Sequence, residues 1–176
     1  QLSDIKSFSP EIILIFGSIF ILVYGIFFTK SKDLNKNIFY ITFVSLILSF
    51  YFSIYVVDLG TNSFNNLLNN DLYTLFFKFL VFTGTIIITY ISYNYLKDLD
   101  ILKPEFFFLI LLSLTGILIL ISSRNIISMF LGLELQSICL YILAAYTRYD
   151  IKSSESGIKY FVMGALLYPF PSTGLD

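Results

Sequence analysis

The chain has 176 residues, of which 57% are hydrophobic and only 13% are charged, and its mean hydropathy is +0.83. A soluble domain of this size would need much more polar surface, so the composition indicates an integral membrane protein. The net charge is −1 and no basic patch suggests binding to nucleic acid. The sequence has no His and a single Cys, Cys139, which excludes an intrachain disulfide and any Cys or His cluster for a structural zinc or an iron–sulfur centre.

Five apolar segments are each close to the roughly 20 residues that a membrane-spanning helix requires. In chain order they cover residues 11–29, 38–57, 73–96, 104–122 and 126–146. A sixth segment, 154–168, is short for a full span, and Pro169 and Pro171 follow it, where Pro would break a helix. We therefore predict an all-α fold, a polytopic transmembrane helix bundle with five full spans and a partial sixth, in a single domain over residues 1–176.

The basic residues that flank these segments fall mostly on one side of the membrane. The side with few of them receives only Lys6 and Arg124, and the other side receives the rest: Lys30, Lys32, Lys36, Lys97, Lys103, Arg148 and Lys152. By the positive-inside rule, the richer side faces the cytoplasm or matrix and the N-terminus lies outside. The abundance of Phe, Ile, Leu, Asn and Lys matches the AT-rich codons of many organelle genomes.

Glu134 is a carboxylate within the fifth apolar segment. Counted from Ile126, it lies roughly 12 Å along a helix that rises about 1.5 Å per residue, in a bilayer core whose half-thickness is about 15 Å. A bare carboxylate at that depth costs several kcal/mol, so such residues usually pair or line a wet path. One interpretation is a structural carboxylate that forms its polar contacts with a neighbouring helix and helps to hold the two helices together. The other, which we favour, is a proton or cation site that faces a wet cavity.

Lys159 is the cation that we expect to act with Glu134 in a proton relay. It lies about one turn into the sixth segment, and the alternative is a lysine whose ammonium snorkels to the interface. The fifth and sixth helices should be antiparallel neighbours because their connection is short. Glu134 is roughly 18 Å from the end of its helix and Lys159 roughly 6 Å into the next. We therefore expect water, or another partner of Glu134, in place of a direct ion pair.

Four further polar residues could assist such a relay. Gln136 and Ser137 follow Glu134 and could form hydrogen bonds across helices. Tyr141 falls seven residues after Glu134 on roughly the same helix face, where it could be a relay hydroxyl or a packing residue. Lys78 lies about one turn into the third span, and we expect its ammonium to snorkel to the interface.

Two motifs resemble a known family. They read Phe130-Leu-Gly-Leu-Glu-Leu-Gln-Ser-Ile-Cys-Leu-Tyr-Ile-Leu-Ala-Ala145 and Lys152-Ser-Ser-Glu-Ser-Gly-Ile-Lys-Tyr-Phe-Val-Met-Gly-Ala-Leu166. Together they closely resemble subunit 2 of NADH–ubiquinone oxidoreductase, an antiporter-like membrane subunit of respiratory complex I. Pro10-Glu-Ile-Ile-Leu resembles the start of that family's first helix. The resemblance covers nearly the whole chain and is strongest from Glu105 to Leu166.

The resemblance implies a membrane-arm subunit that takes part in proton translocation. The family's glutamate on its fifth helix falls on Glu134 and its lysine on the sixth helix on Lys159. The resemblance also implies a non-redox subunit without cofactors, with NADH, FMN, iron–sulfur clusters and ubiquinone bound elsewhere in the complex. The expected partners are other membrane-arm subunits and lipids. The expected location is the mitochondrial inner membrane, with the N-terminus toward the intermembrane space and the gene in the organelle.

The chain departs from the family in lacking the later helices and their lysines, and the resemblance ends after Leu167. We expect either a second polypeptide that carries the remaining helices or a truncated chain. Two other functions stay open at this point. One is a subunit of a related monovalent-cation/proton antiporter, and the other is a structural piece of the membrane arm without a proton-relay group.

Overall fold

A computed structural model describes residues 8–28, 34–58, 71–99, 101–146 and 151–167. The regular elements of these residues are α-helices: α2 (Ser9–Phe27), α3 (Leu34–Asp58), α4 (Leu72–Asp98), α5 (Pro104–Ser122), α6 (Ile126–Ala144) and α7 (Ile151–Leu167). Helices α2 to α6 have the length and apolar composition to cross a membrane, whereas α7 has only 17 residues. The predicted all-α bundle with five full spans is confirmed. The predicted break at Pro169 and Pro171 lies outside the described residues.

Several helices extend beyond the apolar spans predicted from the sequence. Helix α3 begins at Leu34 and α4 ends at Asp98, each a few residues outside its predicted span. Polar residues can continue the main-chain hydrogen bonds of a helix, so a helix need not stop where its apolar sequence stops. Helix α5 coincides with its predicted span, and it begins with Pro104, whose fixed φ suits the first helical position. Helix α6 ends at Ala144, two residues before the predicted end at 146.

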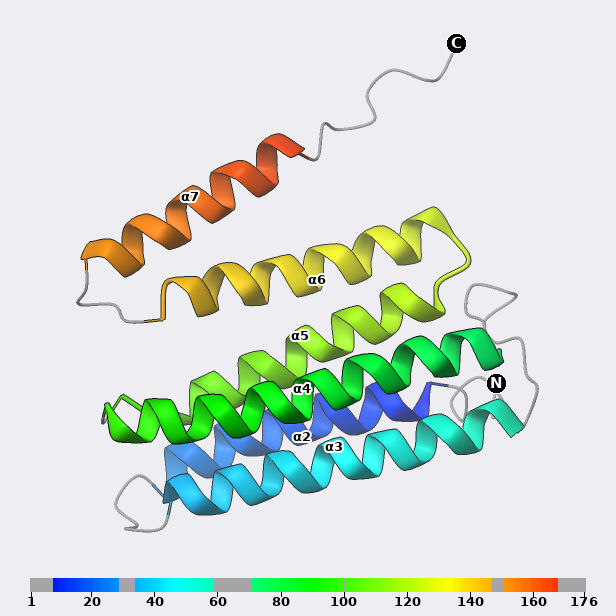
Figure 1. Ribbon diagram of the computed structural model, residues 1–176, viewed down its shortest axis with the longest axis horizontal. Coiled ribbons are helices and arrows are strands. Elements are labelled where there is room, and N and C mark those ends of the chain that lie inside the picture. The colour runs from blue at the N-terminus through cyan, green and yellow to red at the C-terminus, as the bar shows by residue number, and fades with distance from the viewer. Residues whose placement is uncertain (1–7, 29–33, 59–70, 100, 147–150, 168–176) are drawn as a thin grey trace.

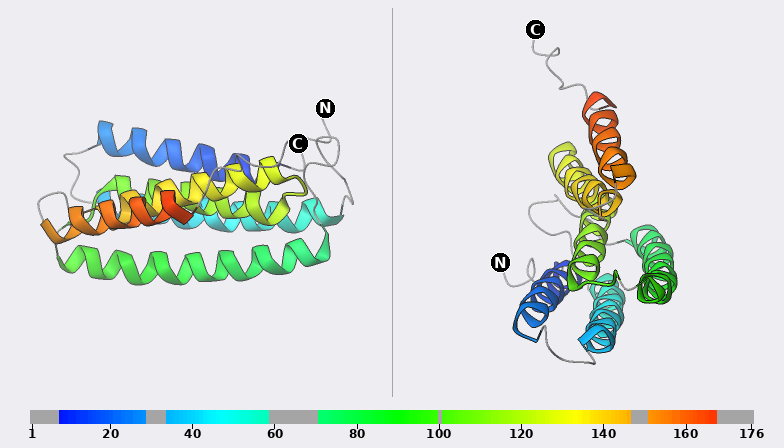
Figure 2. Two further views of the ribbon diagram at one scale, coloured as in Figure 1. Left: turned by 90° about the horizontal axis from the view of Figure 1, so that it is seen from above. Right: turned by 90° about the vertical axis from the view of Figure 1, so that its left-hand side faces the viewer.

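Successive helices run in opposite directions, and α2 to α5 form a four-helix bundle (Figure 1). In this bundle, both α2 and α4 pack against α3 and α5. Helix α6 packs against α5 on one side and against α7 on the other. Figure 2 shows the result: α6 and α7 project from the bundle in a row. Helix α6 therefore has one closely packed face, toward α5, and much open surface in this chain.

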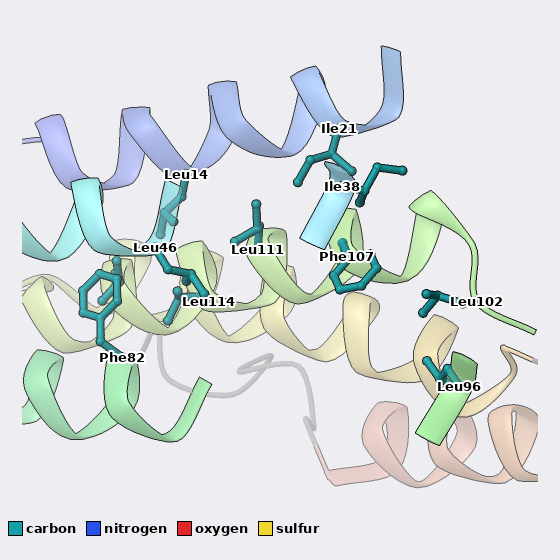
Figure 3. Close-up of a cluster of buried hydrophobic side chains, with 11 residues drawn as sticks. Leu14, Ile21, Ile38, Leu46, Phe82, Leu96, Leu102, Phe107, Leu111 and Leu114 are labelled. Carbon is teal, nitrogen blue, oxygen red and sulfur yellow. The ribbon is translucent and has the colours of Figure 1, made fainter. Parts of the chain in front are cut away.

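The interior of the bundle is a cluster of apolar side chains from α2, α3, α4 and α5 (Figure 3). Its fully buried members include Leu14, Leu46, Phe82 and Leu111. Because lipid tails are as apolar as these side chains, van der Waals packing and polar contacts hold the helices together, with little help from the hydrophobic effect. The polar residues inside this bundle are therefore informative about its function.

Glycines set the spacing between α5 and α6. A Cβ atom on Gly116 would lie 2.8 Å from the main-chain nitrogen of Gln136, and one on Gly132 would lie 2.8 Å from the main-chain nitrogen of Leu120. Only glycine permits so close an approach of two helix backbones. This contact fixes which face of α6 is turned toward the bundle, and hence which face carries Glu134.

Candidate functional site

Glu134 lies on the face of α6 that is turned away from α5. At 3.6 residues per turn it is displaced by about 200° from Gly132, which packs on α5, and by only about 20° from Tyr141 and Ala145. Tyr141 and Ala145 both contact α7: the Tyr141 ring packs against Phe161 at 5.8 Å between centroids, and a Cβ on Gly157 would lie 2.6 Å from the Ala145 Cβ. Glu134 therefore shares the α7-facing side of α6.

The described part of α7 does not reach the level of Glu134. Gly164 lies against the hydroxyl of Tyr141, and α7 runs only three residues further, to Leu167. Glu134 lies seven residues from Tyr141 in the same direction along the pair, or roughly 10 Å. The Glu134 carboxylate is partly exposed, and within the described ranges no hydrogen bond or ion pair reaches it. A carboxylate inside a membrane needs a partner or water, and the described residues supply no partner to Glu134.

Lys159 lies far from Glu134. Because Gly157 is opposite Ala145 and Gly164 is opposite Tyr141, Lys159 lies near the level of Ala144, ten residues or roughly 15 Å from Glu134 along the helix axis. Its Nζ contacts Glu155 Oε1 at 2.6 Å, and both side chains are largely exposed. The predicted absence of a direct Glu134–Lys159 pair therefore agrees with the structure. The relay role of the two residues stays a prediction.

The residues near Glu134 that were expected to assist it have other contacts. The Ser137 hydroxyl donates to the Leu133 carbonyl of its own helix at 2.7 Å. Gln136 lies on the opposite face of α6, where its backbone packs on Gly116. Tyr141 packs among the rings of Tyr160 and Phe161, as the packing interpretation expected. None of these side chains contacts the Glu134 carboxylate within the described residues.

The structure contradicts the expectation that Lys78 snorkels to the interface. Its Nζ donates a hydrogen bond to Glu11 Oε1 at 3.1 Å, and both side chains are only 2% exposed. The pair lies inside the α2–α5 bundle, and burial inside a bundle requires a charge to be paired. The prediction of snorkelling was wrong because it considered the helix of Lys78 alone. Its partner Glu11 lies on another helix, 67 residues earlier in the chain.

Glu11 is the buried site residue that sequence reasoning missed. In the sequence, Glu11 stands out only as part of the segment that resembles the start of the family's first helix, and an acidic residue in the first turn of a helix is common because it suits the helix dipole. A usable signal was present, because the first and third spans of an alternating bundle run parallel. An acidic residue near the start of one and a basic residue near the start of the other can then meet at the same depth. Neither residue alone suggests a pair.

Comparison with known proteins identifies related sequences. Residues 123–167, which contain Glu134 and Lys159, match the NADH:quinone oxidoreductase/Mrp antiporter transmembrane family. Over 161 residues the chain is 37% identical to NADH-quinone oxidoreductase subunit N of Beijerinckia indica, an alignment that covers 89% of this chain and 32% of the relative. It is 36% identical over 168 residues to subunit N of Pelagibacter ubique, covering 89% of this chain and 33% of the relative. The resemblance predicted from the sequence is confirmed.

Two further points define the extent of this similarity. Subunit N 1 of Thermodesulfovibrio yellowstonii is 32% identical over 161 residues, which cover 92% of this chain and 34% of the relative. The chain thus spans about a third of the length of the relatives it matches. The match of the family model covers α6 and α7 and excludes both Glu11 and Lys78.

Proposed function

Because this chain is related to the antiporter-like membrane subunits of NADH-quinone oxidoreductases, we propose that it is a membrane-arm subunit of such an enzyme. In this role it takes part in proton translocation coupled to electron transfer from NADH to ubiquinone. The observation that carries the proposal is the position of Glu134. Its carboxylate lies within an apolar helix, in the segment that matches the family, on a face that the described helices leave open.

Glu134 acts in this proposal by taking up and releasing a proton. The close packing of α6 on α5 through Gly116 and Gly132 holds the helix in one orientation, so the carboxylate is presented to the same side at all times. A fixed carboxylate in an apolar helix binds a proton at a defined depth. Other segments or subunits and bound water complete its surroundings.

Lys159 takes part as a second charge on the same path. About 15 Å separates it from Glu134 along the helix axis, so protons pass between them through water and not through a direct contact. Its pairing with Glu155 keeps a carboxylate next to the ammonium. Replacing Lys159 with Met removes the charge and should lower pumping, whereas Lys159→Arg keeps the charge and should lower it less.

The chain supplies no redox chemistry in this proposal. The sequence contains no His, the commonest haem ligand, and only one Cys, which leaves no set of Cys and His ligands for an iron–sulfur cluster. FMN, iron–sulfur clusters, NADH and ubiquinone are bound by other subunits, which are its partners in the membrane and in the rest of the complex. Its own contribution is the proton path.

Replacing Glu134 with Gln tests the proposal. The intact complex is reconstituted in proteoliposomes, and NADH oxidation and proton uptake are measured together with assembly on a native gel. We expect an assembled complex with strongly reduced pumping, because Gln cannot carry the proton. Glu155→Gln is a matched control on the neighbouring helix and should reduce pumping less. Normal pumping in Glu134→Gln contradicts the proposal and leaves a structural role.

The second candidate function is a subunit of a monovalent-cation/proton antiporter, which the joint description of the matched family supports. Ion-gradient measurements separate the two functions. A redox-linked subunit pumps protons when NADH is supplied, without added Na⁺ or K⁺. An antiporter subunit exchanges protons for a cation when a cation gradient is imposed, without NADH.

The membrane and the orientation are part of the same proposal. We place the chain in the mitochondrial inner membrane, encoded by the organelle, with its N-terminus toward the intermembrane space. The composition and the asymmetry of Lys and Arg support this placement. Protease protection of the N-terminus in mitoplasts tests the orientation. Peptide sequencing of the native complex tests whether the expected second polypeptide with the remaining helices is present.

A further inference from the structure

The Glu11–Lys78 pair joins α2 and α4, two helices whose close packing is with α3 and α5. The long side chains of the pair therefore reach into the interior that these helices share. Both residues lie near the N-terminal ends of their helices, at the end of the bundle where α3 and α5 finish (Figure 1). No residue of this pair lies in the segment that matches the antiporter family.

Three buried oxygen atoms at this end of the bundle have no hydrogen-bond partner among the described residues. They are Oε2 of Glu11, Oγ of Ser53 and Oγ of Ser122. All three residues are at most 2% exposed. An ionised carboxylate offers about four acceptor positions, and buried polar groups in native proteins almost always bind protein, water or an ion. Such a group in a membrane-embedded bundle is costly unless a ligand satisfies it.

Contacts between the helices place Ser53 near the level of Lys78 and roughly one turn beyond the level of Glu11. The Ser49 hydroxyl donates to the Pro10 carbonyl at 2.9 Å, and Ser53 follows one turn later on the same face of α3. Phe50 packs against Phe82 at 5.5 Å between ring centroids. Since α3 and α4 are antiparallel, this contact places Ser53 beside the level of Lys78.

Ser122 lies at a similar level on α5. Gly25 is close to Pro104, and a Cβ on Gly17 would lie 3.8 Å from Leu111, which sets the antiparallel register of α2 and α5. In this register, Ser122 lies roughly one turn beyond the level of Glu11. The three unpartnered oxygens therefore gather at one end of the bundle, around the ion pair.

The charges at this site favour a neutral ligand. A second cation would be repelled by the Lys78 ammonium, and an anion by the Glu11 carboxylate. Water can donate to Glu11 Oε2 and both donate to and accept from the two serine hydroxyls. Other charged residues at this end of the bundle, in the part of the chain that the structure describes, are Asp58, Asp71 and Arg124.

We propose that Glu11 and Lys78 form a second proton-exchange site of this chain, in which bound water connects Glu11 Oε2 with the hydroxyls of Ser53 and Ser122. A proton that arrives through this water binds Glu11 Oε2 and converts the carboxylate to the acid, and its departure restores the carboxylate. The Lys78 Nζ donates to the other oxygen of Glu11. This site rests on the proposed function, since protons must be moving across this subunit.

The site lies toward the end of the bundle where α2 and α4 begin. Toward the middle of the bundle, the next inward-facing residues on the same two helices are Leu14 and Phe82, which are at most 1% exposed (Figure 3). These apolar side chains close the site on its inner side. Toward the helix ends lie the hydroxyl residues Thr74 and Ser122 and the buried apolar residue Val56. The site therefore takes up its protons from the aqueous phase at this end of the bundle.

A density map of the unmodified complex at a resolution that shows water provides the first test. We expect water within hydrogen-bond distance of Glu11 Oε2 and of at least one of the two serine hydroxyls. A map in which protein or lipid atoms fill this space overturns the proposal. This measurement needs no variant, so it applies even if a variant does not assemble.

The double variant Glu11→Leu with Lys78→Met provides the second test, because it removes both charges and leaves neither partner unpaired. In the assembled complex we expect NADH-driven pumping to fall by about a hundredfold, the lower end of the range for loss of a proton-transfer group. Thr89→Val, a buried hydroxyl of α4 that donates to its own helix, is the control and should pump normally. Normal pumping by the assembled double variant overturns the proposal and leaves a dry ion pair.

Glu134→Gln in the same preparation separates the two proposals. If Glu134→Gln pumps normally, the proposed function fails. If Glu134→Gln loses pumping while the Glu11→Leu and Lys78→Met double variant keeps it, only the second proton-exchange site fails.

Discussion

Gly116 of α5 and Gly132 of α6 meet backbone to backbone. A Cβ on Gly116 would lie 2.8 Å from the Gly132 carbonyl oxygen, and a Cβ on Gly132 would lie 2.8 Å from the Gly116 carbonyl oxygen. Real Cβ atoms do not approach main-chain atoms so closely, and a backbone cannot move aside as a flexible side chain can. The contact therefore fixes the rotation of α6, and with it the direction in which Glu134 faces.

Replacing Gly132 with Ala should force α5 and α6 apart. We expect a loss of roughly 1–3 kcal/mol, the usual range for added methyl groups in a packed interior, together with lower pumping because the Glu134 carboxylate is displaced. Thermal unfolding of the purified complex and its pumping rate measure the two effects. Gly84→Ala is the matched control, because a Cβ on Gly84 meets nothing within 4 Å. Equal effects of the two substitutions would contradict the role of this contact.

Much of the fold could be predicted from the sequence because a bilayer imposes a length on apolar helices. The segment beginning at Pro104 illustrates this: its apolar length and the Pro at its start define α5 at both ends. Glu134 was equally visible, because a single carboxylate stands out in an apolar run. These features are local, so they can be read without knowing which helices are neighbours.

The Glu11–Lys78 pair could not be read in the same way. Its members are 67 residues apart, and each has a common local explanation, a helix-start acid and a snorkelling lysine. Only the packing of α2 and α4 around α3 and α5 brings them together. The tight glycine contact between α5 and α6 is missed for the same reason, since a glycine in a helix does not indicate which backbone it faces.

The Tyr146 hydroxyl joins the end of α6 to the segment before α5. It accepts a hydrogen bond from the Lys103 nitrogen at 3.1 Å and donates one to the Ile101 carbonyl at 3.2 Å. Tyr146→Phe removes both bonds and leaves two main-chain groups unpaired, so we expect a loss of roughly 1–3 kcal/mol. Thermal unfolding of the complex measures this loss. Tyr95→Phe, on an exposed tyrosine of α4, is the control and should have little effect.

The same tyrosine predicts a dependence of stability on pH. The pKa of Tyr146 is raised from 10 to about 12, chiefly by burial and to a smaller extent by the charge of Glu105, while the hydrogen bond from Lys103 opposes the rise. The hydroxyl form is thus favoured in the folded state, and its contribution is complete below pH 10 and is lost as the pH rises toward about 12. Unfolding midpoints measured from pH 9 to 12 should fall less steeply for Tyr146→Phe than for the unchanged protein. Parallel curves would contradict the raised pKa.

Ser49 links α3 to α2 across the bundle, whereas Ser45 on the same face does not. The Ser49 hydroxyl donates to the Pro10 carbonyl at 2.9 Å, and the Ser45 hydroxyl donates to Thr42 of its own helix at 2.7 Å. The Pro10 carbonyl adjoins Glu11, so this bond helps to hold the start of α2. Ser49→Ala should destabilise the complex by about 0.6–1.7 kcal/mol, the range for hydrogen bonds between membrane helices. Ser45→Ala should cost less, and a larger loss in Ser45→Ala would contradict this role of the interhelical bond.

Breaking the Glu11–Lys78 pair on one side should be worse than removing it entirely. Lys78→Met leaves the Glu11 carboxylate buried without its ammonium, and such a change typically costs about 3–5 kcal/mol. Adding Glu11→Leu removes that uncompensated charge and should recover most of the lost stability, although two residues are now changed. Unfolding midpoints of the single and double variants in the same complex test this order. A double variant that is less stable than Lys78→Met alone would contradict this order, because removing the second charge would then recover no stability. In that case the packing of the two side chains contributes more to stability than their charges.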